Sequence, residues 1–496
     1  MPPPPTAAIQ QVIAEQNPWR RDGQVPRPFA PPVERPLARH LWQRLLSYEP
    51  RRYQLILGPR RVGKTTALYQ TVARLLANGV DSSRILWLRL DHPVLLREEL
   101  GTLARLAVES SGASRENPVF LMLDELVYAQ SWDIWLKTFY DEQWPIQIAA
   151  TSSAAAALHR GRLESGVGRW EEQHMMPYSF TEFLDLIIED NSLNWARFAG
   201  QTLSQTIESL LVSLDQFEDL TDIRRRLLMT GGFPELLNRA AASLDTGYEN
   251  TEADLLLYSQ QALRPDAVER AIYKDIPQSF GLDNPMMLER MLYVLADQVA
   301  GLVSAANISN DLGVSVPTIE RYLTYLEHAF LIFMLPNYSG TESAKQRRGR
   351  KLYFIDGAVR NAALQRGLAV LDNASDMGHL LENLVAASLR ILTIQAGISL
   401  YHWREGKQEV DLIYDDPQRP IAFEVASSAD HRRGGLEALI TRHPRFFGNS
   451  YLVAPGAPTM SAQSNANGIG SLPLNTLLIA VGAQTHQAMM HRLRAH

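Results

Sequence analysis

The sequence contains no cysteine among its 496 residues. This absence excludes disulfide bonds, thiolate nucleophiles and cysteine-ligated zinc sites, and it fits a reducing compartment. The sequence also lacks any apolar run close to the roughly 20 residues that a membrane-spanning helix needs. Its amino terminus, MPPPPTAAIQQ, has no basic segment followed by an apolar one, as a secretion signal would have. We therefore expect a cytoplasmic protein with no membrane partner.

The sequence also lacks a strong excess of either positive or negative charge. The sequence has 48 Lys and Arg against 54 Asp and Glu, which gives a net charge of −6. This balance provides no general attraction to nucleic acid or anionic lipid, so any contact with a polyanion requires a local patch. With 46% hydrophobic and 21% charged residues, the composition is that of a globular protein.

Hydrophobic patterns indicate an α/β core followed by other parts. Short apolar strands at 54–57, 85–90, 119–123 and 146–150 alternate with segments of helical spacing. Such alternation predicts a parallel sheet with helices on both faces. Strand patterns disappear between about 178 and 300, which predicts a helical region, and they return after residue 350.

The segment after the first strand fits the P-loop pattern, and a helical stretch follows it. Glycines let the backbone N–H groups approach phosphate oxygens, and the helix adds the positive end of its dipole. Lys64 is then placed to reach the β- and γ-phosphates of ATP, and the Thr65 hydroxyl to take one magnesium position. A plain glycine-bounded turn, the alternative, has no use for Lys-Thr at its end. The residues predicted to bind the nucleotide are Gly58, Pro59, Arg60, Arg61, Val62, Gly63, Lys64, Thr65 and Thr66.

Two adjacent acids end the third predicted strand, Val119–Leu123. We predict that Asp124 holds the magnesium shell and that Glu125 polarises the attacking water as a general base. Successive strand residues point to opposite faces, so the two acids can divide these tasks. The alternative is a strand that runs out into a solvated acidic turn. Hydroxyl residues follow the fourth strand, and we assign Ser152 to sensing the γ-phosphate, against the alternative of a serine-rich loop.

An ordered set of segments gives the chain a family resemblance. In order, these segments are GPRRVGKTT, VFLMLDE, ATSSAAA, ESGVGRW, PYSFTEFL, GGFPELL, GVSVPTIERYLTYLEHAFLI, KLYFIDGAVRNAAL and EVDLIYDD with IAFEV. Together they resemble the prokaryotic AAA+-type ATPases that carry a C-terminal PD-(D/E)XK nuclease-like module of unknown function. The resemblance covers nearly the whole chain from about residue 17.

This resemblance implies the domain organisation. The expected parts are a proline-rich, loosely held arm (1–36), a P-loop AAA+-type core (37–177), a helical lid (178–300), a winged helix (301–370) and a PD-(D/E)XK-like domain (371–496). It also implies an arginine supplied to the nucleotide site, often that of a neighbouring subunit in a homo-oligomer. Arg169 is the first candidate by position and Arg162 the second. The alternative for Arg169 is a surface arginine in a glycine loop.

A helix-turn-helix pattern lies in the expected winged helix. Helical spacing at 308–312 and 317–330 is interrupted by Gly313. The second helix offers only Arg321 as a basic residue off its apolar stripe, but the basic run Lys345–Lys351 is placed to form a wing that contacts DNA phosphates. The alternative is a winged helix used for packing, with a solvated charged hairpin.

The expected nuclease-like domain presents three carboxylates. Asp411 and Glu424 lie on adjacent predicted strands and would offer hard oxygen ligands to a second Mg²⁺. The resemblance assigns Glu382 as the helix-borne acid. An active site of this type also requires a lysine two residues after Glu424 to stabilise charge on the attacked phosphate, but this position is occupied by Ala426. Possible surrogates from neighbouring loops are Lys407, Arg432 and Arg433.

The sequence thus predicts an ATPase that uses ATP and Mg²⁺. We expect its cycle to move the lid and winged helix, and so to remodel or recruit a partner, with DNA as one candidate. One rival interpretation is an ATP-dependent nuclease, which requires a substitute for the missing lysine. Another is a nucleotide-gated scaffold that does not hydrolyse ATP.

Overall fold

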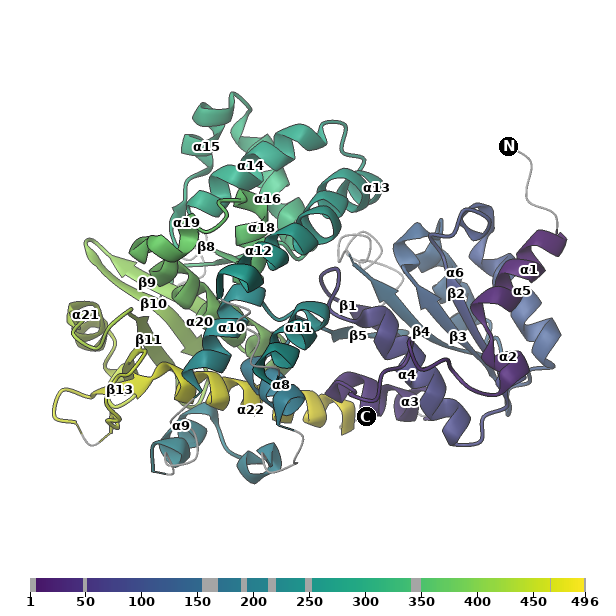
Figure 1. Cartoon of the computed structure of the whole chain (residues 1–496), viewed down its shortest axis with the longest axis horizontal. Helices are drawn as coiled ribbons and strands as arrows, with labels where there is room; N and C mark the ends of the chain where they lie inside the picture. Colours follow the sequence, from purple (N-terminus) through teal and green to yellow (C-terminus); the bar gives the residue numbers. More distant parts are fainter. Residues whose placement is uncertain are drawn as a thin grey trace. The chain divides into compact units, whose positions relative to one another are not determined.

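The structure is a computed structural model that describes residues 6–47, 51–153, 168–188, 194–212, 220–245, 252–339, 349–463 and 465–494. The chain divides into two compact units, whose helices and strands are labelled in Figure 1. The first unit comprises Met1–Met176, Asp275–Gly281 and Arg492–His496. The second comprises Pro177–Lys274 and Leu282–His491.

A parallel sheet forms the centre of the first unit. Among the described residues, its strands lie in the order β2-β3-β4-β1-β5, and every neighbouring pair is parallel. Their bounds are β1 Tyr53–Leu57, β2 Ile85–Arg89, β3 Val119–Asp124, β4 Ile146–Ser152 and β5 Trp170–His174. Because β1, β3 and β4 are buried along their whole length, they appear in the sequence as continuous rather than alternating apolar runs.

The predicted strands 54–57, 85–90, 119–123 and 146–150 correspond to β1 to β4 with ends shifted by one or two residues. Strand β5 was not predicted, because its sequence WEEQH offers no apolar run. Helices α3 and α4 pack on each other and on the sheet, and α5 packs on α6 (Figure 1). The helices of this unit described below are α3 Pro36–Leu46, α4 Lys64–Ala77, α5 Leu100–Ser111, α6 Trp132–Asp141 and α13 Ile276–Phe280. The short 3₁₀ segments are η1 Ser82–Arg84, η2 Leu95–Arg97 and η3 Leu126–Tyr128.

The N-terminal segment is more firmly held than a loose proline-rich arm. It forms α1 Thr6–Gln16 and α2 Trp19–Asp22, and α1 packs on β2. The Asn17 amide donates to the carbonyl of Trp87 (2.8 Å) and accepts from the N–H of the same residue (2.6 Å). This contact satisfies the backbone of β2, which is an edge strand. Trp19 is fully buried, and Ile9, Val12 and Ile13 of α1 are buried as well, so one face of this segment belongs to the core of the unit.

The second unit begins with helices, as the absence of strand patterns predicted. Their bounds are α8 Phe180–Ile187, η4 Trp195–Phe198, α9 Leu203–Val212, α10 Thr221–Thr230, α11 Pro234–Asp245, α12 Glu252–Leu263 and α14 Pro285–Asp297. Two π-helical stretches follow α12, at Arg264–Glu269 and Ala271–Asp275. No helix in the described ranges is long and apolar enough to cross a membrane.

The helix-turn-helix is present in the second unit. It consists of α15 Ala305–Leu312 and α16 Val316–His328, separated by Gly313 in the left-handed region (φ 69°). Ser315 caps α16 by accepting from the N–H of Thr318. A small antiparallel sheet in the order β6-β8-β7 adjoins these helices, with β6 Leu302–Val303, β7 Ile332–Leu335 and β8 Arg350–Phe354.

A separate α/β sheet forms the C-terminal part of the second unit. Within the described residues its strand order is β13-β12-β11-β10-β9, antiparallel from β9 to β11 and parallel from β11 to β13. The strands are β9 Ser399–Glu405, β10 Gln408–Asp415, β11 Ile421–Val425, β12 Ser450–Ala454 and β13 Ile469–Pro473. The accompanying helices are α18 Gly357–Leu364, α19 Ala369–Asp372, α20 Ala374–Ala396, α21 Gly434–Arg442, η8 Pro444–Phe446 and α22 Leu474–Arg494.

Candidate nucleotide site

The P-loop connects the carboxyl end of β1 to the start of α4. Gly63 has φ 92° and Arg61 has φ 64°, so the loop turns through left-handed backbone just before the helix begins at Lys64. At Gly58, an added Cβ would lie 1.9 Å from the carbonyl oxygen of Met175, so only glycine fits there. The loop therefore has the local geometry of a phosphate cradle, with backbone N–H groups ahead of a helix terminus.

Lys64 is buried under this loop. Its ammonium donates to the carbonyl oxygens of Gly58 (2.8 Å) and Pro59 (2.7 Å). Burial lowers the pKa of Lys64 to about 8, although the charge of Glu125 acts in the opposite direction. A buried ammonium held by carbonyl groups of the loop is suited to neutralise the charge of a phosphate bound there.

Asp124 faces the start of α4. Each of its carboxylate oxygens lies 3.0 Å from the Thr65 hydroxyl, and the Thr151 hydroxyl donates to it at 2.6 Å. Asp124 is 4% exposed, and this burial, followed by the charge of Glu125, raises its pKa to about 6. A carboxylate and a hydroxyl are hard oxygen ligands of the kind that Mg²⁺ prefers beside phosphates. These two residues fit a magnesium ion held together with a nucleotide.

Glu125 leaves the strand rather than continuing it. Strand β3 ends at Asp124, and Glu125 adopts a left-handed conformation (φ 58°). The Ser153 hydroxyl donates to its Oε2 at 3.0 Å, and Nη1 of Arg60 lies 3.7 Å from its Oε1. The two acids are thus separated by a turn in the backbone, and not by strand alternation.

Asp275 joins this site from a distant part of the sequence. Its carboxylate accepts from Nε and Nη2 of Arg60, each at 2.5 Å, and from the hydroxyls of Tyr128 (3.2 Å) and Ser153 (3.3 Å). Burial alone would lower the pKa of Arg60, but the hydrogen bonds and charge of Asp275 raise it above its ordinary value. No local sequence pattern predicts this role for Asp275, because 215 residues separate it from Arg60.

The remaining nucleotide-site predictions fall in different places. Ser152 is buried at the carboxyl end of β4, where it pairs with Leu57 beside the P-loop. Arg169 lies just before β5, and its carbonyl accepts from the N–H of Tyr53, at the amino end of β1. This is the opposite edge of the sheet from the P-loop, and Arg169 there forms an ion pair with Asp141 (2.8 Å). Arg162 lies outside the described residues.

A second charged cluster lies in the second unit, around Lys351 of β8. The Lys351 ammonium lies 2.8 Å from Glu382, 2.8 Å from Glu409 and 2.7 Å from Asp411. Asp411 also accepts from the N–H of Val425, which brings β10 and β11 together beside the cluster. The structure therefore places a lysine against the predicted carboxylates, but from a strand that the sequence analysis assigned to a basic wing.

Electrostatics in this cluster follow from burial. Burial, followed by the charge of Asp411, raises the pKa values of Glu382 and Glu424. Burial opposes the charge on Lys351, but Asp411 and its neighbours raise the Lys351 pKa well above the ordinary value. Among the described residues, no group of three or more His, Cys, Asp or Glu side chains is arranged to hold a metal ion. The second Mg²⁺ site stays a prediction.

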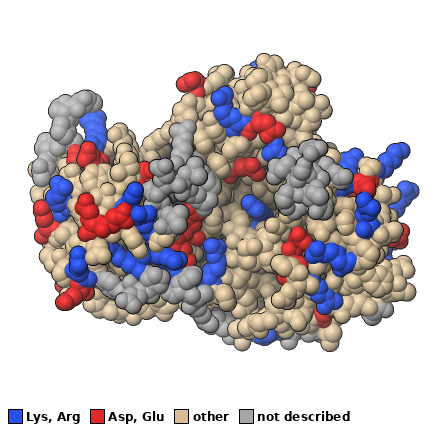
Figure 2. Space-filling view, turned by 180° about the vertical axis from the view of Figure 1, so that it is seen from behind, with Lys and Arg blue, Asp and Glu red and all other residues tan. Residues whose placement is uncertain are grey.

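The predicted DNA-binding surface is only partly within the described residues. Lys345, Arg347 and Arg348 lie outside them, whereas Arg350 pairs with Glu320 (2.5 Å). Arg321 is exposed on α16. On the face shown in Figure 2, basic and acidic side chains are interspersed and neither sign forms a continuous field.

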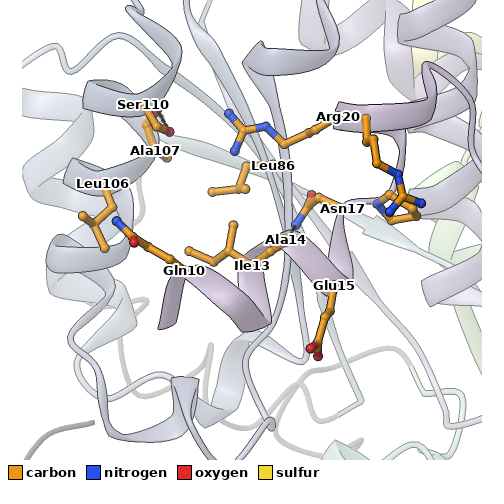
Figure 3. Close-up of a pocket in the computed structure, with 12 residues that line it drawn as sticks. Gln10, Ile13, Ala14, Glu15, Asn17, Arg20, Leu86, Leu106, Ala107 and Ser110 are labelled. Atoms are coloured by element: carbon orange, nitrogen blue, oxygen red, sulfur yellow. Dashed lines mark hydrogen bonds between the residues drawn. The ribbon is translucent and has the colours of Figure 1, made fainter. Parts of the chain in front are cut away.

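A pocket of about 530 Å³ lies elsewhere in the first unit (Figure 3). Its lining comes from α1, α2, β2 and α5, with apolar side chains such as Ile13 and Leu86 and polar ones such as Gln10 and Arg20. No P-loop residue lines it. No local sequence pattern predicts this pocket, because the pocket depends on the packing of the N-terminal helices.

Comparisons with known proteins agree with this description. Residues 50–184, which include the P-loop and the whole parallel sheet, match a family model described as an AAA domain. Residues 221–369 and 377–475 match two domains of unknown function, DUF8612 and DUF4143. The nuclease-like character of the C-terminal part therefore stays a prediction.

Similar whole proteins cover most of the chain. Two uncharacterized proteins of Methanocaldococcus jannaschii, MJ1637 and MJ1544, are each 26% identical to it, over 72% and 73% of this chain and 72% of each relative. An uncharacterized protein of Haemophilus influenzae is 23% identical over 75% of this chain and 82% of its own.

Solved structures give weaker likenesses. The Thermotoga maritima RuvB Holliday junction branch migration motor is 19% identical with a TM-score of 0.29, covering 62% of this chain and 91% of that one. The Aeropyrum pernix Orc1 protein in complex with DNA is 13% identical with a TM-score of 0.31, covering 68% of this chain and 92% of that one. Scores this low assign no function. The family match and the P-loop geometry together support a nucleotide-binding core of AAA+ type, joined to a separate C-terminal α/β domain.

Proposed function

We propose that this chain is a Mg²⁺-dependent ATPase whose catalytic centre lies at the carboxyl edge of the parallel sheet. The observation that carries the proposal is the distance of 3.0 Å between the Thr65 hydroxyl and the Asp124 carboxylate. Their separation in sequence is 59 residues, yet they meet where a P-loop ATPase holds its metal.

Each residue has a task in this proposal. Lys64 and the backbone of the loop bind the phosphates, and Thr65 and Asp124 hold Mg²⁺, which supplies charge neutralisation when it is bound. Glu125 accepts a proton from the attacking water, and Ser152 lies on the adjacent strand within the same edge. Arg169 lies at the amino edge of the sheet, whereas the P-loop lies at the carboxyl edge, so Arg169 cannot contact a nucleotide bound in the same chain. We assign it to the nucleotide site of a neighbouring copy.

We propose further that turnover moves the helical lid (178–300) and the winged helix (301–370). The support is that the chain leaves the first unit after Met176 and re-enters it at Asp275, beside the P-loop. The work done is remodelling or recruiting a partner. DNA is the candidate partner because of the helix-turn-helix and the basic run that precedes Lys351, whose own ammonium is buried among carboxylates.

The test is ATP turnover by Glu125→Gln and by Glu116→Gln, a matched change at an exposed residue. Loss of the general base should lower kcat by about 10²-fold or more while ATP still binds. Glu116→Gln should keep the wild-type rate. If the wild-type protein binds ATP but releases no phosphate, a nucleotide-gated scaffold replaces the ATPase proposal.

One observation favours a second candidate function. Lys351 lies 2.7 Å from Asp411, so a lysine is present although Ala426 replaces the expected one. An ATP-dependent nuclease would use this lysine to stabilise charge on the attacked phosphate. Nicking of plasmid DNA with Mg²⁺, lost in Asp411→Asn and kept in Asp416→Asn, would support it. Uncut plasmid at all ATP and Mg²⁺ concentrations would leave the cluster a structural ion network.

A further inference from the structure

The guanidinium of Arg60 is shared between two carboxylates. Nε and Nη2 form a two-pronged contact with Asp275, each at 2.5 Å, and Nη1 lies 3.7 Å from Oε1 of Glu125. Because the guanidinium is planar and rigid, fixing two of its nitrogens also fixes the direction of the third. The contact with Asp275 therefore fixes the direction of Nη1 of Arg60.

The hydroxyl of Ser153 is shared in the same way. It lies 3.0 Å from Oε2 of Glu125 and 3.3 Å from Oδ2 of Asp275. A hydroxyl has one hydrogen, so it donates to only one of these carboxylates at a time. Both oxygens of Glu125 thus lie near groups that also contact Asp275.

The balance of this competition bears on Glu125 as a base. A carboxylate paired with a guanidinium and hydrogen-bonded to a hydroxyl is held in one orientation, and it must leave those partners before it can turn toward an attacking water. When Asp275 takes a larger share of Arg60 and Ser153, Glu125 is held less tightly. Without Asp275, both donors would turn fully to Glu125.

Asp275 also has a distinctive place in the chain. It ends the π-helical stretch Ala271–Asp275 and precedes α13, and the chain belongs to the first unit only from Asp275 to Gly281 before returning to the second. π-Helical segments inside helices occur frequently at functional sites. A change in the second unit therefore has a covalent path to Asp275 from both sides.

We propose that Asp275 is a positioning residue that sets how tightly Arg60 and Ser153 hold Glu125, and thereby controls ATP hydrolysis. Seating of the segment Asp275–Gly281 against the P-loop loosens the hold and permits hydrolysis. Withdrawal of the segment tightens the hold and stops hydrolysis. The inference rests on the proposed ATPase function, because it concerns the availability of Glu125 as a base.

The first experiment is a double-mutant cycle of Asp275→Asn and Arg60→Gln. We measure the rate of ATP hydrolysis and divide it by the concentration of sites that bind a fluorescent ATP analogue, so that unfolded protein does not lower the apparent kcat. The Kd of the same analogue is measured in parallel. Asp275→Asn should lower kcat by about tenfold, a fraction of what a general base contributes, with Kd within about twofold. Adding Arg60→Gln should restore at least half of that loss, because the guanidinium that would otherwise hold Glu125 is then absent. Asp283→Asn, an exposed neighbour in sequence, is the matched control.

A second variant keeps the test decisive if Asp275→Asn does not fold. Ser153→Ala removes one donor from Glu125 and leaves the contact between Arg60 and Asp275 intact, so kcat should rise above the wild-type value. A kcat at or below wild type in Ser153→Ala overturns the inference. So does an Asp275→Asn protein with wild-type kcat, or a double variant as slow as Asp275→Asn alone. A wild-type protein without turnover would instead overturn the proposed function itself.

Discussion

The hydroxyl of Thr65 lies 3.0 Å from both carboxylate oxygens of Asp124, so the first turn of α4 and the end of β3 share one site. This relationship follows from the strand order, in which β4 alone separates β1 from β3. Parallel strands bring their carboxyl ends to one edge, and the loop after β1 lies over the end of β3. The predicted phosphate and metal residues are therefore neighbours in space.

Lys64→Ala should abolish ATP binding while the fold is kept. The ammonium makes charge-assisted contacts that are worth about 3 kcal/mol or more to a bound phosphate, which is an affinity loss of at least about 100-fold. Lys407→Ala, at an exposed residue, should bind ATP normally. Titration of a fluorescent ATP analogue, with the melting temperature as the check on folding, measures both. Unchanged affinity in a folded Lys64→Ala protein would contradict the site.

Lys351→Met should destabilise the second unit. It leaves Glu382, Glu409 and Asp411 without their shared cation, and breaking a buried ion pair costs about 3–5 kcal/mol. Lys407→Met is the exposed control and should leave the melting temperature unchanged. Differential scanning calorimetry measures the difference, and equal melting temperatures would show that the cluster does not support the fold.

Added Mg²⁺ should raise the melting temperature of Lys351→Met if Glu382, Asp411 and Glu424 bind a metal. The carboxylates would then exchange one cation for another, and binding to the folded state alone stabilises it. The wild-type protein, in which Lys351 already lies among these carboxylates, should respond much less. An identical response of the two proteins would count against the second metal site.

Asp356 should make the second unit less stable as pH rises through the weakly acidic range. Burial raises its pKa from 3.8 to about 6, so the folded state keeps a proton that the unfolded chain has lost. This stabilisation is fully present below pH 3.8 and is lost as pH rises through about 6; it amounts to at most about 3 kcal/mol.

Melting temperatures between about pH 4 and pH 7 test this linkage. Asp356→Asn should remove this component of the slope, although it also lowers stability at every pH, because the N–H groups of Gly232 and Ala358 lose a carboxylate. Asp372→Asn, at an exposed position, should keep the wild-type slope. Parallel slopes for wild type and Asp356→Asn would refute the assignment.

Neutralising Lys345, Arg347, Arg348 and Arg350 should flatten the salt dependence of any DNA affinity. Each phosphate contact that is lost should lower the slope of log affinity against log salt by about 0.9. The control neutralises an equal number of exposed arginines of the first unit, which are Arg27, Arg97, Arg105 and Arg115. The DNA affinity of both variants and of the wild-type protein is measured over a series of salt concentrations. If affinity and slope stay the same in the first variant, the wing does not contact DNA.

Much of the first unit was predictable from local patterns. The strands β1 to β4 are buried apolar runs, and Gly58, Lys64 and Thr65 identify the loop between β1 and α4. The edge strand β5 and the N-terminal helices were missed or misread, because their sequence patterns are weak. Trp19 is buried only because α1 and α2 pack against the edge strand β2.

The phosphate loop and the two acids at the end of β3 could be predicted from local sequence patterns, because that chemistry requires glycine, lysine and carboxylate side chains at those places. The cations and hydroxyls that contact those acids became apparent only from the fold. Asp275 reaches Arg60 across 215 residues, and Lys351 reaches Asp411 across 60. Such long-range ion pairs leave no local pattern, because a charged residue looks the same in sequence whether folding buries it against a partner or leaves it in water.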